Sequence, residues 1–155
     1  MVVPLAELPV QAGLDCFCSI IIPVYQDNAA LDLLLDDLQP TRCSGYQLIV
    51  VDADRQTQID EALVRRCDAY LFSEKGRALQ MNSGVAQATG QILWFLHADT
   101  RLDAEACHQQ IMQITLSPKV WGRFNVRLSG NQLIFRVIER LMNKRSCWTG
   151  IATGD

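Results

Sequence analysis

The sequence contains no apolar run that approaches the roughly 18 residues of a membrane-spanning helix. Its apolar runs are short, and residues 92–96 are typical of them. The N-terminus also lacks the basic stretch of a signal peptide, and Glu7 and Asp15 stand there instead. The sequence therefore predicts neither a membrane-spanning helix nor a secretory leader.

The charged residues show no strong excess of either sign. The chain has 14 Lys+Arg and 17 Asp+Glu, a formal net charge of -3, and no block of basic residues. A dedicated nucleic-acid-binding protein would carry a basic patch, so this class is excluded. With 155 residues that are 49% hydrophobic and 20% charged, the chain is expected to fold as one domain, residues 1–155, and not to be disordered.

Closely spaced cysteine pairs are almost absent. Of the six cysteines only Cys16 and Cys18 are close, as C-x-C, and neither a second pair nor a nearby histidine accompanies them. A structural zinc site needs four converging ligands, so these cysteines do not predict one. Reduced, partly buried thiols of a cytoplasmic protein are the simpler interpretation.

Short apolar runs alternate along the chain with segments of helical periodicity. The runs predict buried strands at residues 19–24, 47–51, 70–72 and 91–96. The periodic segments predict helices at residues 28–38, 57–67, 77–89 and 103–116. Four such units in series are typical of an α/β fold, a mostly parallel Rossmann-like sheet with helices on both faces.

The pattern changes after these units. Residues 120–128 alternate apolar and polar side chains, which predicts a strand with two different faces. Trp121 and Arg123 on its open face are candidates for packing or for an acceptor-side role. Residues 129–131 predict a turn, and residues 132–143 an amphipathic helix.

A few side chains of these elements can be assigned individually. Trp94 is expected in the core, as are Met81 and Met112, which stand at helical spacing. His108 stands beside two glutamines and is expected at the surface.

Polar and charged residues follow all four predicted strands. They are Tyr25-Gln26-Asp27, Asp52-Ala53-Asp54, residues 73–77 (SEKGR) and His97-Ala98-Asp99. The carboxyl ends of parallel strands meet at one edge of a sheet, where the ligand crevices of α/β proteins lie. Four strand ends of the same polarity therefore predict a polar ligand crevice, although Asp27 and Asp103 are each explained as helix N-caps.

The residue types at this edge suit a phosphorylated ligand. Asp99, at the end of a rigid strand, is a hard ligand for a divalent cation, which also binds phosphate oxygens. Lys75 and Arg77 stand near a predicted helix start, where the helix dipole adds to their attraction for phosphate. Tyr25 offers a ring to a nucleobase, and Asp52 offers an acceptor to a base N–H or a ribose hydroxyl. The residues by themselves predict a nucleotide or other phosphorylated ligand with a metal ion.

Several motifs along the chain resemble glycosyltransferase family 2. They are SIIIPVY at 19–25, IVVDAD at 49–54, KGRALQMNSGVAQATG at 75–90, ILWFLHADTRL at 92–102, WGRFNVRLSG at 121–130 and TGIATGD at 149–155. The set is most similar to a bacterial branch with GRA-x-QMN, FLHADT and TGIATGD motifs, and the resemblance covers residues 19–155. It implies the GT-A fold, a nucleotide-diphospho-sugar donor, a divalent metal (Mg²⁺ or Mn²⁺) and inverting transfer by direct displacement.

The resemblance assigns roles to individual positions. Pro23 and Tyr25 match the strand end that lines the donor's base pocket, and Asp52 matches the aspartate that reads the base. Arg77 and Asn82 match positions that face the donor.

The metal motif and one loop depart from the family pattern. Asp99 matches the last aspartate of the D-x-D motif and is the predicted metal ligand, whereas His97 replaces the first aspartate and is expected among the donor-binding residues. Asp54-Arg55-Gln56 replaces the usual Gly-Ser-Thr after Asp52, which leaves the identity of the base open.

No residue matches the acidic pair that deprotonates the acceptor hydroxyl in this family. The catalytic base is therefore expected beyond residue 155, and the chain is expected to be the donor-binding part of a C-terminally truncated hexosyltransferase. The hydroxyl acceptor, peripheral membrane association through it, and homo-oligomerisation are left open. Two alternatives also stay open. One is a non-catalytic nucleotide-sugar-binding module, which the missing base favours. The other is a nucleotidyltransferase of similar fold, although such an enzyme is expected to have a glycine-rich loop after the first strand, where this chain has Tyr25-Gln26-Asp27.

Overall fold

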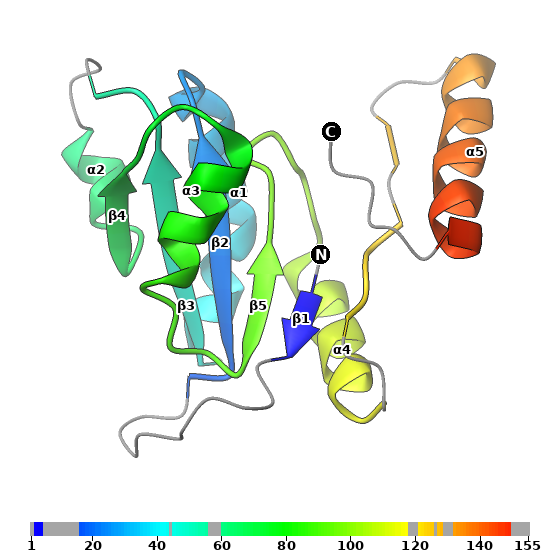
Figure 1. The fold of residues 1–155 in the computed structure, drawn as a ribbon, viewed down its shortest axis with the longest axis horizontal. Coiled ribbons are helices and arrows are strands. Elements are labelled where there is room, and N and C mark those ends of the chain that lie inside the picture. Colours follow the sequence, from blue (N-terminus) through cyan, green and yellow to red (C-terminus); the bar gives the residue numbers. More distant parts are fainter. Residues whose placement is uncertain are drawn as a thin grey trace.

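A computed structural model describes residues 2–4, 16–43, 45–55, 60–117, 121–125, 127–128 and 132–149. Its centre is a sheet with the strand order β1-β5-β2-β3-β4 (Figure 1). The strands are β1 (Val2–Pro4), β2 (Cys18–Val24), β3 (Tyr46–Asp52), β4 (Ala69–Phe72) and β5 (Ile92–Phe95). β2 pairs in parallel with β3 and β5, and β3 in parallel with β4, whereas β1 is antiparallel to β5. The predicted mostly parallel sheet is confirmed.

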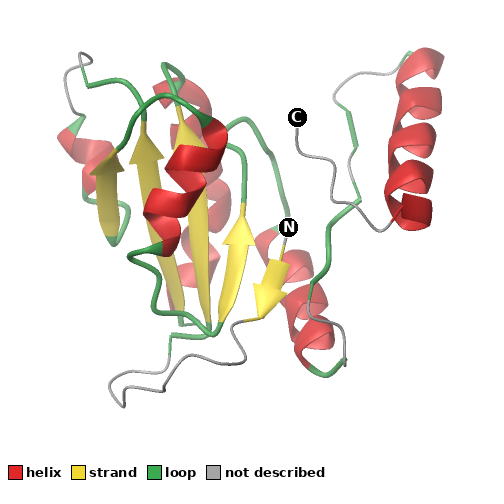
Figure 2. Ribbon diagram, viewed as in Figure 1, coloured by secondary structure: helices red, strands yellow, loops and turns green. Residues whose placement is uncertain are grey.

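Helices cover both faces of the sheet, as Figure 2 shows. The described helices are α1 (Asn28–Leu38), α2 (Glu61–Val64), α3 (Arg77–Val85), α4 (Ala104–Thr115) and α5 (Leu133–Thr149), with a short 3-10 helix η1 (Gln39–Cys43) after α1. Helix α3 packs on one face, and α1 and α4 pack on the other. Alternate residues of β2 enter the two apolar layers: Ile20 and Ile22 face α1 and α4, and Ile21 faces α3. Because both faces are covered, the strand carries an uninterrupted apolar run.

Helix α1 shows how local sequence signals build one of these layers. Its buried residues are Leu31, Leu34, Leu35 and Leu38, at the spacing of one helix face. Asp27 caps its start, because Asp27 Oδ1 accepts the backbone N–H of Ala30 at 3.3 Å. Asp103 caps α4 in the same way, with Oδ1 accepting the N–H of Ala106 at 3.0 Å. Both N-cap interpretations are confirmed.

Helix α3 lies unusually close to the strands that it covers. A Cβ atom added at Gly84 would stand 2.5 Å from Ile21 Cγ2 and 3.2 Å from Val51 Cγ2, so only glycine allows this approach. One turn earlier, the side chain of Gln80 is buried and its Nε2 donates to the carbonyls of Val24 at 2.7 Å and of Val51 at 2.8 Å. These bonds fix the helix at the carboxyl ends of β2 and β3.

Two predicted helices are shorter in the structure. The helix predicted at 57–67 is helical from Glu61 to Val64, and its predicted start lies outside the described residues. The helix predicted at 77–89 ends at Val85. The chain turns there because Gln47 of β3 holds the residues after the helix: its Nε2 donates to Gln87 O at 3.1 Å, and its Oε1 accepts the N–H of Thr89 at 2.9 Å.

The strand predicted at residues 120–128 is wrong. In its described part Gly122 forms an isolated bridge, and the other residues are not extended in a sheet. The segment lies along α5 instead: Arg123 donates to the side chain of Asn143 at 3.1 Å, and Leu128 N–H donates to Glu139 Oε1 at 2.6 Å. The edge of β5 is taken by β1, a three-residue strand too short to show any periodicity.

Helix α5 confirms the helix predicted at 132–143, and its backbone is helical from Leu133 to Thr149. Glu139 is buried and pairs with Arg136 at 3.0 Å, on the side of the helix that bonds to Leu128. Exposed apolar side chains gather elsewhere on the helix: Leu133, Ile134, Val137, Ile138 and Leu141. In the described part of the chain, no helix is long and apolar enough to cross a membrane.

The sequence assigns four side chains individually to the core or to the surface. One of them, Met81, is half-buried in the structure. Trp94 is in the core, as predicted. Met112 is 41% exposed, so its core assignment is wrong. The surface assignment of His108 is also wrong: its Nδ1 lies 2.7 Å from the hydroxyl of Tyr46, and its ring meets Phe17 and Tyr46 edge-on, because α4 turns it toward the amino end of the sheet.

Candidate functional site

The loops after the parallel strands meet at one edge of the sheet (Figure 1). The backbone joins them directly, because Ala53 N–H donates to Val24 O at 3.1 Å and Ser73 N–H donates to Asp52 O at 2.9 Å. The polar residues after β2, β3 and β4 are therefore neighbours, as the sequence predicted.

Tyr25 and Lys75 form a cation–π pair at this edge. The Nζ atom of Lys75 lies 3.9 Å from the centroid of the Tyr25 ring, and the tyrosine side chain is 39% exposed. Gln26 follows in the left-handed region with φ 54°, and its Nε2 donates to Asp54 Oδ2 at 3.0 Å. The ring is thus presented to solvent beside a positive charge, which suits a planar base linked to an anion.

Asp52 is the buried carboxylate of the site, only 4% exposed. Its Oδ1 accepts the backbone N–H of Asp54 at 2.8 Å, and its Oδ2 accepts the hydroxyl of Tyr70 at 2.7 Å. Burial, and secondly this bond to Asp52, raise the pKa of Tyr70 well above its usual range, so the tyrosine stays a donor. Sequence reasoning placed Tyr70 in a strand and missed this contact.

The start of α3 supplies the cationic side of the edge. Gly76 precedes the helix with φ 153°, a conformation that favours glycine, and no side chain caps the helix start. The first N–H groups of such a helix favour an anion. Arg77 is exposed at its first position. Asn82 is exposed as well, but it stands two residues after the buried Gln80 and so lies on the opposite side of α3, away from Arg77.

The loop after β5 carries the other predicted residues. His97 is half-buried and Asp99 is exposed. The loop is tied to α1, because the Arg101 guanidinium donates to both oxygens of Asp37 at 2.7 and 2.8 Å, and the Leu102 N–H donates to Asp37 at 3.2 Å. The bond from Arg101 lowers the pKa of Asp37 below its usual range.

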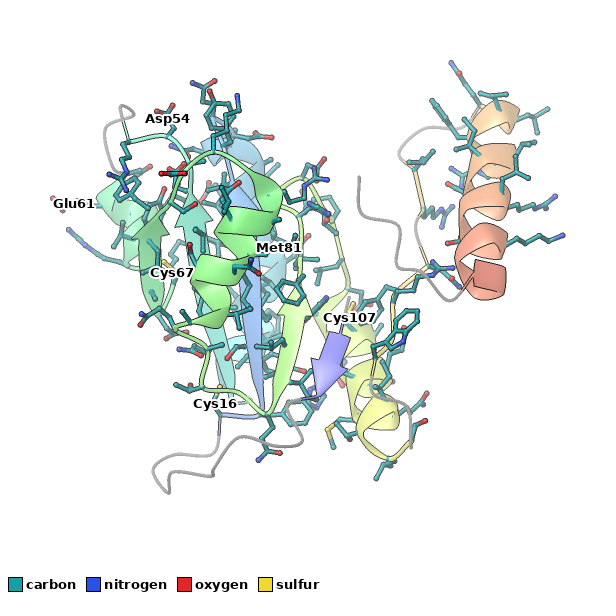
Figure 3. All side chains as sticks on the ribbon, viewed as in Figure 1. Cys16, Asp54, Glu61, Cys67, Met81 and Cys107 are labelled. Atoms are coloured by element: carbon teal, nitrogen blue, oxygen red, sulfur yellow. The ribbon has the colours of Figure 1, made fainter. Side chains whose placement is uncertain are left out.

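No group of three or more His, Cys, Asp or Glu residues that could hold a metal occurs among the described residues. Cys16, Cys67 and Cys107 are spread over the domain (Figure 3), in line with the expectation of separate thiols. Within the described part of the chain Asp99 has no hydrogen-bond or ion-pair partner, which leaves its carboxylate open toward solvent.

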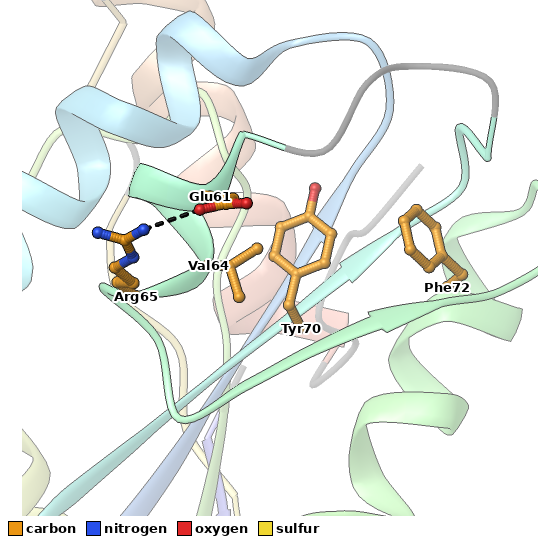
Figure 4. Close-up of a pocket in the computed structure, with 5 residues that line it drawn as sticks. All are labelled: Glu61, Val64, Arg65, Tyr70 and Phe72. Atoms are coloured by element: carbon orange, nitrogen blue, oxygen red, sulfur yellow. Dashed lines mark hydrogen bonds and ion pairs between the residues drawn. The ribbon is translucent and has the colours of Figure 1, made fainter.

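A cavity of about 340 Å³ lies below this edge, between α2 and β4 (Figure 4). Its lining residues are Glu61, Val64, Arg65, Tyr70 and Phe72, and an ion pair of 2.8 Å joins Glu61 to Arg65. None of the residues predicted for the donor lines it. The cavity touches the site through Tyr70, whose ring forms its wall and whose hydroxyl binds Asp52.

Comparison with known proteins identifies the family. Residues 19–150 match the family model described as "Glycosyl transferase family 2". The chain belongs to glycosyl transferase family 2. The resemblance that the motifs suggested is therefore confirmed, and the matched range contains every residue predicted for the donor and the metal. No curated protein gives a significant match.

Solved structures share the fold of this family 2 chain. The crystal structure of S. aureus TarS is similar with a TM-score of 0.52 and 22% sequence identity, over 64% of this chain and 20% of TarS. TarS 1–349 in complex with UDP gives the same values over 32% of that chain. Mannosyltransferase PcManGT from Pyrobaculum calidifontis, in complex with GDP-Man and Mn²⁺, has a TM-score of 0.54 and 22% identity, over 72% of this chain and 37% of that chain. The chain thus adopts the GT-A fold and spans well under half the length of these proteins.

Proposed function

We propose that residues 1–155 form a single GT-A-like domain, the donor-binding part of a glycosyltransferase. This part binds a nucleotide-diphospho-sugar, and the whole protein transfers the sugar with inversion to a hydroxyl acceptor in the cytoplasm. The observation that carries the proposal is the pairing of Lys75 with Tyr25 beside the buried Asp52, at the carboxyl edge of the sheet. It joins an aromatic platform, an acceptor for base N–H groups and a phosphate-binding charge within one site. TarS and PcManGT, which share the fold, have been solved with UDP and with GDP-Man.

Each part of the donor has a counterpart at this edge. The nucleobase lies against Tyr25, with Pro23 below it at the end of β2, and Asp52 accepts a base N–H. The diphosphate lies at the start of α3, where Arg77 and Lys75 attract it together with the helix dipole. His97 contributes from the loop after β5. Asn82 contacts the donor from the outer side of α3. For this contact the donor, or a segment of the chain that covers it, must extend to that side of the helix.

A divalent cation fits this donor set with Asp99 as its protein ligand. Hard cations such as Mg²⁺ and Mn²⁺ often take one or two carboxylates from the protein and fill the remaining positions with phosphate oxygens and water. The exposed Asp99 carboxylate supplies such a ligand. When bound, the cation would stabilise the negative charge of the departing diphosphate. None of the described residues is assigned as the base that deprotonates the acceptor.

Calorimetric titration of the chain with UDP and with GDP tests the proposal. Each titration is run with Mn²⁺, with Mg²⁺ and with a chelator. We expect saturable binding of at least one nucleotide, tighter with metal, and no comparable binding of the free nucleoside, because the diphosphate supplies most of the charge contacts. Absence of binding of both nucleotides at millimolar concentration with metal would refute it. Donor binding without sugar transfer by any longer form of the protein would favour the non-catalytic binding module.

A further inference from the structure

The carboxylate of Asp52 is held from two sides by its own chain. The Asp54 N–H donates to Oδ1 at 2.8 Å, and the Tyr70 hydroxyl donates to Oδ2 at 2.7 Å. Each oxygen has two lone pairs, so one position on each oxygen is already used. With 4% of the residue exposed, only a small part of the carboxylate can meet a ligand.

The tyrosine that makes one of these bonds is itself fixed. Its ring packs edge-on against Phe72, with centroids 5.7 Å apart, and lines the cavity beside Val64 (Figure 4). Burial raises the pKa of its hydroxyl well above the usual range. The hydroxyl therefore remains protonated and aimed at Asp52, which serves as an acceptor.

Both oxygens of Asp52 already accept a bond and the residue is almost wholly buried, so little room is left for two base donors at once. Guanine presents two adjacent donors, N1–H and the N2 amino group, and a carboxylate binds both only when its two oxygens face the base together. Uracil presents a single N–H between two carbonyls. We propose that Tyr70 is a positioning residue, which holds Asp52 so that it accepts one N–H and thereby favours a uracil-type base over guanine. This inference rests on the donor site proposed above.

The variant Tyr70→Phe tests the proposal, because it removes the hydroxyl and keeps the ring that packs on Phe72. Binding of UDP, GDP and inorganic pyrophosphate is measured with Mn²⁺. We expect UDP to bind about 3- to 10-fold more weakly, an effect on the order of one ordinary hydrogen bond, because the carboxylate loses the contact that orients it. The UDP-to-GDP preference should fall by a similar factor. Pyrophosphate, which has no base, should bind unchanged.

Tyr46→Phe is the matched control. Tyr46 is also a tyrosine of the sheet, and its hydroxyl lies 2.7 Å from His108 Nδ1 at the far end of β3. Its variant should change thermal stability as Tyr70→Phe does and leave all three ligands unaffected. A double-mutant cycle adds a readout that a structural role would not produce: in the Asp52→Asn background, Tyr70→Phe should have little further effect on UDP binding.

Three outcomes would overturn the inference. One is unchanged UDP affinity and preference in Tyr70→Phe, and another is additive effects in the cycle. The third needs no variant: the parent chain binds GDP as tightly as UDP, or more tightly. Failure of the parent to bind either nucleotide would instead refute the proposed function, so the two ideas fail in different ways.

Discussion

Lys75 covers one face of the Tyr25 ring, with its Nζ atom 3.9 Å from the ring centroid, although the two residues come from different loops. Tyr25 follows β2 and Lys75 follows β4, two strands that are not neighbours in the sheet. The pair therefore bridges the site across β3, above Asp52. A nucleotide whose base stacks on the open face of Tyr25 would have its phosphates close to the positive charge of Lys75.

Replacing Tyr25 should weaken nucleotide binding through loss of stacking. Tyr25→Ala should reduce UDP affinity by about 1–3 kcal/mol, the usual contribution of one aromatic platform to a base. Tyr25→Phe keeps the ring and should stay close to the parent. Pyrophosphate titration is the control for general damage, and equal losses for pyrophosphate and UDP would show that the ring does not contact the base.

Replacing Asp99 should remove the metal dependence of donor binding. In Asp99→Ala the ratio of UDP affinities with and without Mn²⁺ should fall by about 10-fold or more, since loss of even an outer partner of a metal ligand costs about that much. Asp103→Ala is the matched control in the same loop. It removes the cap of α4 and should lower the free energy of unfolding by about 1 kcal/mol while the metal dependence stays. An unchanged metal ratio in Asp99→Ala would exclude the metal role.

Gln80 should contribute to stability and Asn82 should not. Gln80→Leu loses two buried hydrogen bonds to β2 and β3, so the free energy of unfolding should fall by about 1–3 kcal/mol in urea titrations. Asn82→Ala, on the opposite side of α3, should change it by less than about 0.5 kcal/mol. Asn82→Ala should nevertheless weaken nucleotide binding, because Asn82 is proposed to contact the donor.

The pair of Arg101 and Asp37 should make stability depend weakly on pH in acid. The folded-state pKa of Asp37 lies below its usual value, so its contribution is present above the ordinary aspartate pKa and is lost as the pH falls through the lower one. Thermal unfolding of the parent and of Asp37→Asn should differ by a small, constant amount near neutral pH, because the Arg101 side chain is largely exposed and water screens the pair. The difference should vanish in strong acid, and a difference that grows toward acid would contradict the assignment.

Local sequence signals predicted the parts of the fold that depend on neighbouring residues. The boundaries of α1 are those expected, since Asp27, the leucine spacing and Pro40 all act within one or two turns of the helix. The four parallel strands were found because both of their faces are buried and their apolar runs are uninterrupted. The polar edge followed from the rule that parallel strands end together.

Other features depend on contacts between distant segments, which periodicity does not contain. The alternation at residues 120–128 predicted a strand, but β1 occupies the edge of β5, and Arg123 and Leu128 bond to α5 instead. His108 became a partner of Tyr46 because the fold brings the two residues, 62 positions apart, side by side.

By itself the sequence determined the order of the four parallel strands and of the helices between them, the edge at which polar residues collect, and the residue types that suit a nucleotide and a metal. The tertiary structure decided how those residues face each other: Lys75 over Tyr25, Gln80 on two strand ends, and Tyr70 on Asp52. The physical reason is that element formation is governed by interactions within a few residues, whereas the geometry of the site arises when packing of the sheet joins residues 18 to 56 positions apart.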